Sequence, residues 1–190
     1  MNTSDIRRAL QSDAFAQNYL VDVFSYDQVV RNISDRDNKF YVFNTKPQLL
    51  PGEHWMAIGV RDGQAQYFDS FGRHPDRYPS LSARLKQLFS SVQWNKTPFQ
   101  NPSTTACGDY CVLFGLFFAR GKNLQDYVDW LSITKDSETR DHTVRQLMTS
   151  IYGDNIYSSY KNNTSVLSGV QQLHIDRVVK SVSGKCLFES

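Results

Sequence analysis

A cysteine at the start of an apolar helix is the residue best suited to act as a nucleophile. Cys107 follows a polar loop and opens the run CGDYCVLFGLFFA, which is apolar on all sides and is predicted to form a buried helix. The unpaired N–H groups at a helix start favour a thiolate over a thiol. Seven residues upstream, Gln100 offers a neutral amide donor for an oxyanion. We expect Gly108 to let a substrate backbone approach. The alternative for Cys107 is an ordinary core cysteine.

His54 is the histidine best placed to act as a base. Of the four histidines, only His54 opens a strongly apolar segment, residues 55–60, and a tryptophan beside it could shield the ring. The Asp-Gly pair at 62–63 predicts a hairpin turn, which brings Asp69 next to His54 across the two strands. A carboxylate in that position orients the imidazole and sets its tautomer. The alternative for Asp69 is an aspartate that merely ends a strand.

Apolar periodicity and turn signals predict the elements that must position these residues. We expect Asp141 to cap the last of the helices and Gly153 to end it. The fold class is α+β, a small mixed or antiparallel sheet flanked by helices, with the nucleophile at the N-terminus of a buried central helix. The expected helices span 4–20, 79–91, 107–121, 124–133 and 141–152, and the expected strands 40–44, 54–61, 64–71 and 92–94.

Composition sets limits on class and compartment. With 190 residues, the chain suits one domain of residues 1–153, a linker-like segment of 154–168 and a tail of 169–190. No apolar run is long enough for a membrane span, and no secretory signal is visible. Three cysteines do not make a disulfide framework, so we expect an intracellular protein that is not secreted.

Three motifs together resemble the adenovirus endopeptidase (adenain) family, within the cysteine protease superfamily that also contains the SUMO-specific proteases. They are GEHWMA at 52–57, FDSFG at 68–72 and QNPSTTACG at 100–108. Their order and spacing match over roughly residues 40 to 120. The seven-residue step from Gln100 to Cys107 is similar to the adenovirus pattern, whereas the SUMO proteases typically show six.

The resemblance implies a role for each candidate residue. Cys107 would be the nucleophile, His54 its base and Gln100 an oxyanion-hole donor, with the Cys107 backbone N–H as a second donor. Asp69 stands where the adenovirus enzyme usually has glutamate. The implied activity is cleavage of structural precursor proteins of a DNA virus or virus-like transposon at glycine-containing sites, in the host nucleus or the virion. The resemblance implies no metal or small-molecule cofactor.

The resemblance also implies two activators. The adenovirus enzyme binds a short viral peptide as an added strand, tethered by a disulfide to a cysteine upstream of the glutamine; residues 85–98 contain no cysteine here. However, GVQQL at 169–173 and KCLF at 185–188 are similar to that peptide, so residues 169–188 are a candidate activating strand in cis. The alternative is an ordinary C-terminal segment. The family also uses DNA, and scattered basic residues with a net charge of +2 leave nonspecific DNA binding open.

Two rival functions remain at this point. One is an isopeptidase that acts on the Gly-Gly tail of a SUMO- or ubiquitin-like protein. The other is a binding module that keeps the fold without catalysis, for which retention of His54, Asp69, Gln100 and Cys107 together has no reason.

Overall fold

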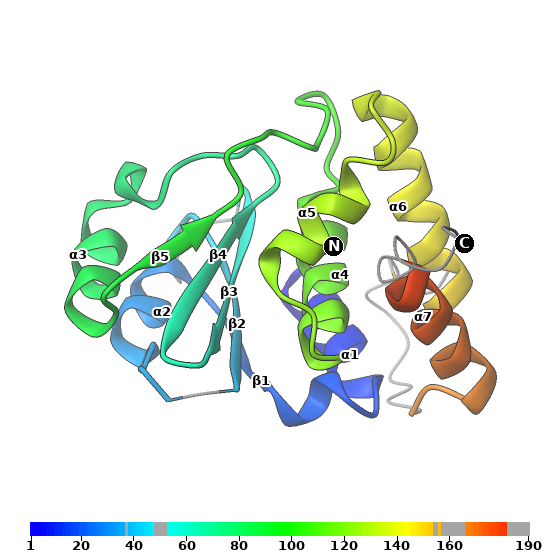
Figure 1. Ribbon diagram of the computed structural model, residues 1–190, viewed down its shortest axis with the longest axis horizontal. Coiled ribbons are helices and arrows are strands. Elements are labelled where there is room, and N and C mark those ends of the chain that lie inside the picture. Colours follow the sequence, from blue (N-terminus) through cyan, green and yellow to red (C-terminus); the bar gives the residue numbers. More distant parts are fainter. Residues whose placement is uncertain (37, 48–52, 154–155, 157–165, 182–190) are drawn as a thin grey trace, which may run out of the picture.

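A five-stranded mixed sheet lies at the centre of the protein, with helices on both of its faces (Figure 1). The structure is a computed structural model that describes residues 1–36, 38–47, 53–153, 156 and 166–181. The strands follow one another across the sheet in chain order; β1 and β2 are parallel, as are β4 and β5, whereas the central pairs are antiparallel. The strands are β1 (Leu20–Phe24), β2 (Lys39–Asn44), β3 (Trp55–Arg61), β4 (Gln64–Asp69) and β5 (Val92–Trp94).

The helices cover the sheet on two sides, and the predicted α+β class is confirmed. Helices α2 and α3 lie on one face, and α1 and α4 on the other, with α5, α6 and α7 beyond them (Figure 1). No helix in the described ranges is long and apolar enough to cross a membrane. The helices are α1 (Thr3–Ser12), α2 (Tyr26–Asn32), α3 (Pro79–Leu88), α4 (Cys107–Ala119), α5 (Leu124–Leu131), α6 (Ser137–Tyr152) and α7 (Gly169–Ser181), with short 3-10 turns η1 (Ala16–Asn18) and η2 (Pro75–Arg77).

The sheet is apolar on both faces because each face packs against helices. Along β2, Phe40 and Val42 belong to the core under α1 and α4, while Tyr41 and Phe43 belong to the core under α2 and α3. Successive side chains of a strand point to opposite faces, so an unbroken apolar run is what a sheet covered on both sides requires. The predicted hairpin of β3 and β4 is confirmed, with positive φ angles at the Asp-Gly pair of 62–63.

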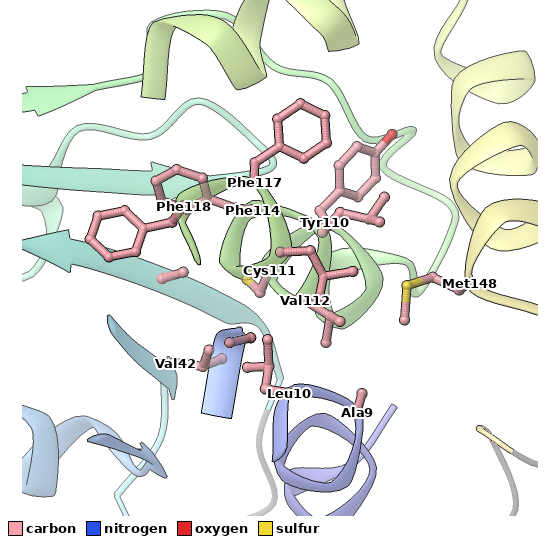
Figure 2. Packing of buried hydrophobic residues seen from close by; sticks show 14 of the residues in the cluster. Ala9, Leu10, Val42, Tyr110, Cys111, Val112, Phe114, Phe117, Phe118 and Met148 are labelled. Carbon is pink, nitrogen blue, oxygen red and sulfur yellow. The ribbon is translucent and has the colours of Figure 1, made fainter. Parts of the chain in front are cut away.

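Helix α4 runs through the middle of the molecule, as the sequence predicted. All thirteen of its residues are buried. Its side chains contact β2 on one side and α1 and α6 on others (Figure 2). A Cβ at Gly59 of β3 would lie 2.6 Å from the Phe118 ring, so this glycine lets the helix lie close to the sheet. The strand and the helix that carry the candidate residues are therefore held rigidly together.

Two predicted helix boundaries are wrong by four residues or more. The first helix ends at Ser12, not at residue 20, because the Asp13 carboxylate accepts hydrogen bonds from the backbone N–H groups of Phe15 and Ala16 and turns the chain toward β1. Helix α6 begins at Ser137, capped by Asp136, so Asp141 is not its cap. Asp141 lies inside the helix and is buried.

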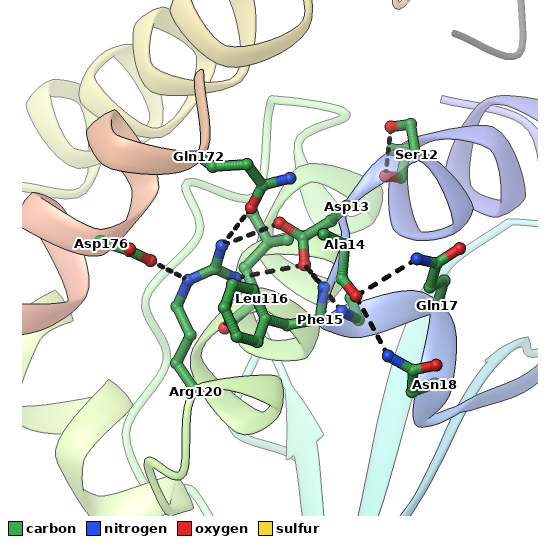
Figure 3. A network of polar contacts seen from close by, with 12 residues as sticks. Ser12, Asp13, Ala14, Phe15, Gln17, Asn18, Leu116, Arg120, Gln172 and Asp176 are labelled. Atoms are coloured by element: carbon green, nitrogen blue, oxygen red, sulfur yellow. Dashed lines mark hydrogen bonds and ion pairs between the residues drawn. The ribbon is translucent and has the colours of Figure 1, made fainter. Parts of the chain in front are cut away.

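The predicted strand in the tail is also wrong over the described residues. Residues 169–181 form helix α7, which packs against α6, and the second half of the candidate activating segment, including Cys186, lies outside the described residues. Arg120, at the C-terminal end of α4, binds Asp176 and Gln172 of α7 and the buried Asp13 (Figure 3). Arg120, which binds α7, is at the opposite end of α4 from Cys107, and a helix of this length spans about 20 Å.

Candidate active site

His54 and Asp69 meet where β3 begins and β4 ends. His54 immediately precedes β3, and Asp69, the last residue of β4, lies opposite Met56. His54 and Met56 are two residues apart and so share a face of the sheet with Asp69. The Nε2 atom of His54 lies 2.7 Å from Oδ1 of Asp69, and both side chains are buried. The structure therefore brings this predicted pair together in direct contact, without an intervening water.

Asp69 is held through its carboxylate by the Phe71 backbone and through its own backbone by Asn95. Oδ1 also accepts a hydrogen bond from the backbone N–H of Phe71 at 2.8 Å. The Asn95 side chain accepts from the Asp69 N–H and donates to the Asp69 carbonyl oxygen, at 2.9 and 2.6 Å. Asn95 follows β5, so the pairing of β4 with β5 holds the end of β4 in place. Sequence reasoning missed Asn95, whose partner is 26 residues away.

The His54 ring is held on its face as well as at its edge. Phe71 stacks on the imidazole with ring centres 4.7 Å apart and an interplanar angle of 28°. The other ring nitrogen, Nδ1, is buried and has no hydrogen-bond partner among the described residues. With Nε2 occupied by Asp69, Nδ1 is the nitrogen left to exchange a proton.

The environment of His54 favours its charged form. Burial lowers the pKa of the imidazole, but hydrogen bonding to Asp69 and to Cys107, and the charges of these two groups, outweigh burial and raise the pKa from 6.5 to about 9. Because Asp69 occupies Nε2, the influence of Cys107 comes from the Nδ1 side. Nδ1 forms no complete hydrogen bond, as is common at catalytic contacts before a substrate closes the site.

The N-terminus of α4 presents backbone donors that no side chain caps. Its N-cap is Ala106, which cannot accept a hydrogen bond through its side chain. By contrast, α1, α5 and α6 begin with Asn2, Asn123 and Asp136, whose side chains accept from the first turn. Cys107 is 8% exposed, so its thiol is reachable from the surface only over a small area. A first-turn N–H is thus available to a ligand at this position.

Gln100 is oriented by its neighbours on both sides. Its Oε1 accepts from the Ser70 hydroxyl at 2.7 Å, and its Nε2 donates to the Thr104 carbonyl oxygen at 2.8 Å. The amide nitrogen therefore faces the loop that leads into Cys107, and it also donates to the Thr104 hydroxyl oxygen at 3.3 Å. The backbone N–H of Gln100 also donates to the Ser70 carbonyl oxygen, next to Asp69.

Asp141 of α6 holds the loop that joins Gln100 to Cys107. Its carboxylate accepts from the Asn101 N–H, the Thr104 hydroxyl and the Tyr110 hydroxyl. The neighbouring Arg140 donates to the Phe99 carbonyl oxygen at 2.7 Å. Sequence reasoning interpreted Asp141 as a helix cap and missed this function, because its partners lie more than 30 residues away along the chain.

Gly108 and Trp55 serve packing, and the expectation for Gly108 is wrong. A Cβ at Gly108 would lie 3.0 Å from the Met1 Cβ and 3.5 Å from the Trp55 ring, so the glycine faces the protein interior and not a substrate. Trp55 is buried, and its indole donates to the Met1 carbonyl oxygen at 3.1 Å. Trp55, which was expected to shield the His54 ring, thus packs on the side of β3 that faces α4.

No protein-family model matches this chain, and no curated protein sequence matches it. Across the part of the chain that the structure describes, no three His, Cys, Asp or Glu side chains are grouped to hold a metal ion. The site brings together groups of the types that acyl transfer to a thiol requires. They are a thiol, an imidazole that an aspartate orients, and N–H donors on separate elements.

Proposed function

We propose that the protein is a cysteine endopeptidase with Cys107 as nucleophile and His54 as its base. The observation that carries the proposal is the state of the His54 ring. Asp69 Oδ1 lies 2.7 Å from Nε2, whereas Nδ1 is buried and has no hydrogen-bond partner among the described residues. Cys107 also contributes to the raised pKa of the ring. A purely structural histidine in a buried site satisfies both nitrogens, so a free one needs another explanation.

The proposed reaction follows from these contacts. The Cys107 proton passes to His54 Nδ1, and the thiolate attacks the carbonyl carbon of the scissile peptide bond. The oxyanion accepts from Gln100 Nε2 and the Cys107 backbone N–H. The imidazolium, stabilised by Asp69, then donates its proton to the leaving amine as the C–N bond breaks. Water, deprotonated by His54, hydrolyses the thioester and returns the thiol.

The substrate class follows from the motifs. Resemblance to the adenain family over roughly residues 40 to 120 supports cleavage of viral or transposon structural precursors at glycine-containing sites, in the nucleus or the virion. DNA and an activating peptide have no part in the proposed reaction. Over residues 169–181 the candidate activating segment is a helix and not a strand.

The test uses the full chain and two matched substrates. One is a peptide with an aliphatic residue followed by glycines, and the other is a ubiquitin-like fusion with a Gly-Gly tail. We expect cleavage of the peptide, complete loss with Cys107→Ser, and no loss with Cys111→Ser, because Cys111 is fully buried one turn deeper in α4. Exclusive cleavage of the fusion would favour the isopeptidase, and a Cys107 thiol no more reactive than free cysteine at neutral pH would favour the binding module.

A further inference from the structure

A cavity of about 330 Å³ adjoins the candidate active site on the far side of the His54 ring. His54 and Phe71 form its inner wall, and segments after β2, before β3 and after β4 form the rest. Neither Cys107 nor Gln100 is among the residues that line it. The cavity therefore borders the imidazole, and the thiol is not part of its wall.

The cavity carries an excess of positive charge. Its lining contains the cations Lys46, Arg73 and Arg77 and one carboxylate, Glu53. Glu53 pairs with Lys46 at 3.0 Å and cancels one of these charges. Arg73 and Arg77 form no ion pair with a described residue. Two guanidinium groups thus remain for an external anion.

Arg73 is linked to the catalytic ring by a stack. Its guanidinium lies over the Phe71 ring, 4.8 Å from the ring centre, and Phe71 stacks on His54 at 4.7 Å. Arg77 is exposed on η2, where the backbone N–H of Arg77 donates to the His74 carbonyl oxygen. The two arginines consequently face the cavity from one short segment that the Phe71 stack holds next to the site.

The chemistry of the proposed reaction fixes which part of a substrate meets this cavity. His54 gives its proton to the leaving amine, so the peptide that follows the scissile bond must extend past the imidazole. The cavity is what lies past the imidazole. We propose that it binds an acidic side chain located within the first few residues after the scissile bond. This inference rests on the proposed endopeptidase function.

The test measures how the full chain cleaves peptides that differ only after the scissile bond. The peptides carry Glu or Gln at each of the first four positions after that bond and are identical before it. The value of kcat/KM is measured for each peptide. We expect one position to favour Glu by roughly three- to tenfold, the range that an exposed charge-assisted pair supports. The preference should fall as salt concentration rises.

Two variants test whether the preference for Glu comes from the cavity. Arg77→Gln should lower the Glu-to-Gln ratio of kcat/KM, and Arg73→Gln together with Arg77→Gln should bring it close to one. The control is Arg177→Gln, which removes the same charge from an exposed arginine of α7, far from the cavity, and should retain the full preference. Thermal unfolding of Arg77→Gln and Arg177→Gln should match that of the parent, because both arginines are exposed.

The outcomes distinguish failure of the proposed anion site from failure of the proposed endopeptidase function. Equal cleavage of Glu and Gln peptides at all four positions overturns the anion site and leaves the endopeptidase standing. A preference that survives Arg77→Gln and Arg73→Gln together also overturns the site. Loss of DNA-duplex binding in Arg77→Gln, with no peptide preference in the parent, would assign the arginines to a polyanion instead. Failure to cleave any peptide overturns both proposals.

Discussion

Asp69 and His54 form a buried pair in which one carboxylate oxygen serves both the imidazole and the chain that follows it. Oδ1 of Asp69 lies 2.7 Å from His54 Nε2 and 2.8 Å from the Phe71 N–H. The same Phe71 stacks on the ring that Asp69 holds. A single aspartate thus holds the imidazole at its edge directly and positions the Phe71 ring that stacks on its face. The FDSFG motif therefore works as one structural unit.

The pH dependence of activity should change when Asp69 loses its charge. In the parent, kcat/KM should fall above about pH 9, where His54 loses the proton that it gives to the leaving amine. The Asp69 carboxylate raises that pKa, so Asp69→Asn should move the alkaline limb to lower pH. The rate should also fall, roughly 10³- to 10⁴-fold, if the amide stabilises the wrong tautomer. A pH profile with an unmoved alkaline limb would contradict this role.

Stability should decrease as the pH rises from neutral to alkaline. The pKa of His54 is about 9 in the folded chain against an ordinary 6.5. A raised pKa means that the stabilisation is fully present below about pH 6.5 and is lost as the pH rises through 9, on the order of 3 kcal/mol. Urea unfolding at pH 6 and pH 9.5 measures this loss. His54→Gln serves as the reference, because every other titrating group is retained in it.

Gln100→Ala should reduce catalysis without reducing the reactivity of the thiol. Loss of one oxyanion donor costs roughly 10² to 10³ in kcat. Alkylation of Cys107 by iodoacetamide forms no oxyanion, so its rate should stay close to that of the parent. Ser70→Ala removes only the hydroxyl that orients the amide and should have a smaller effect in the same direction. A parallel fall in alkylation rate would mean that Gln100 acts on the structure instead.

Asp141→Asn should loosen the loop between Gln100 and Cys107. The carboxylate accepts three hydrogen bonds with two oxygens, and an amide can accept with only one. We expect a loss of about 1 to 3 kcal/mol in unfolding free energy. In addition, kcat should fall more than KM rises, because the oxyanion donor moves. Tyr110→Phe removes one of the three bonds and should show a smaller change in both quantities.

Arg120→Ala should destabilise the fold strongly while the folded protein keeps its turnover rate. The substitution leaves the fully buried Asp13 without its cation, which costs about 3 to 5 kcal/mol. Asp176→Asn removes only the partly exposed partner on α7 and should cost about 1 kcal/mol or less. Chemical unfolding measures both. A loss of kcat in folded Arg120→Ala would show that the far end of α4 does influence Cys107.

The sequence was sufficient to predict those parts of the site whose signals lie within a short stretch of the chain. The hairpin of β3 and β4 was predictable because an apolar strand, an Asp-Gly turn and a second strand occur within 15 residues. The burial of α4 was predictable because thirteen consecutive residues contain only one charged side chain, Asp109. The contact between His54 and Asp69 followed from these elements alone.

The early end of the first helix comes from the local hydrogen bonds of Asp13, whereas other errors come from long-range contacts. The start of α6 is polar, so no apolar period revealed it, and Asp141 is buried only because Tyr110 and Thr104 come to it from another part of the chain. The strand in the tail was predicted because GVQQL at 169–173 is similar to the activating peptide, and Val170 and Leu173 within it are exposed. The tail helix is set by Ile175 and Val179, which are four residues apart and buried against the domain.

The pairing of Asp13 with Arg120 has a consequence for synthesis of the chain. The two residues are separated by 107 positions, and Asp176 is added to the pair later still. While the chain is on the ribosome, α1 has no cation with which to bury Asp13 until α4 has emerged. We expect the first helix to complete its docking only after the central helix has been made, because the charge of Asp13 has no cation before then.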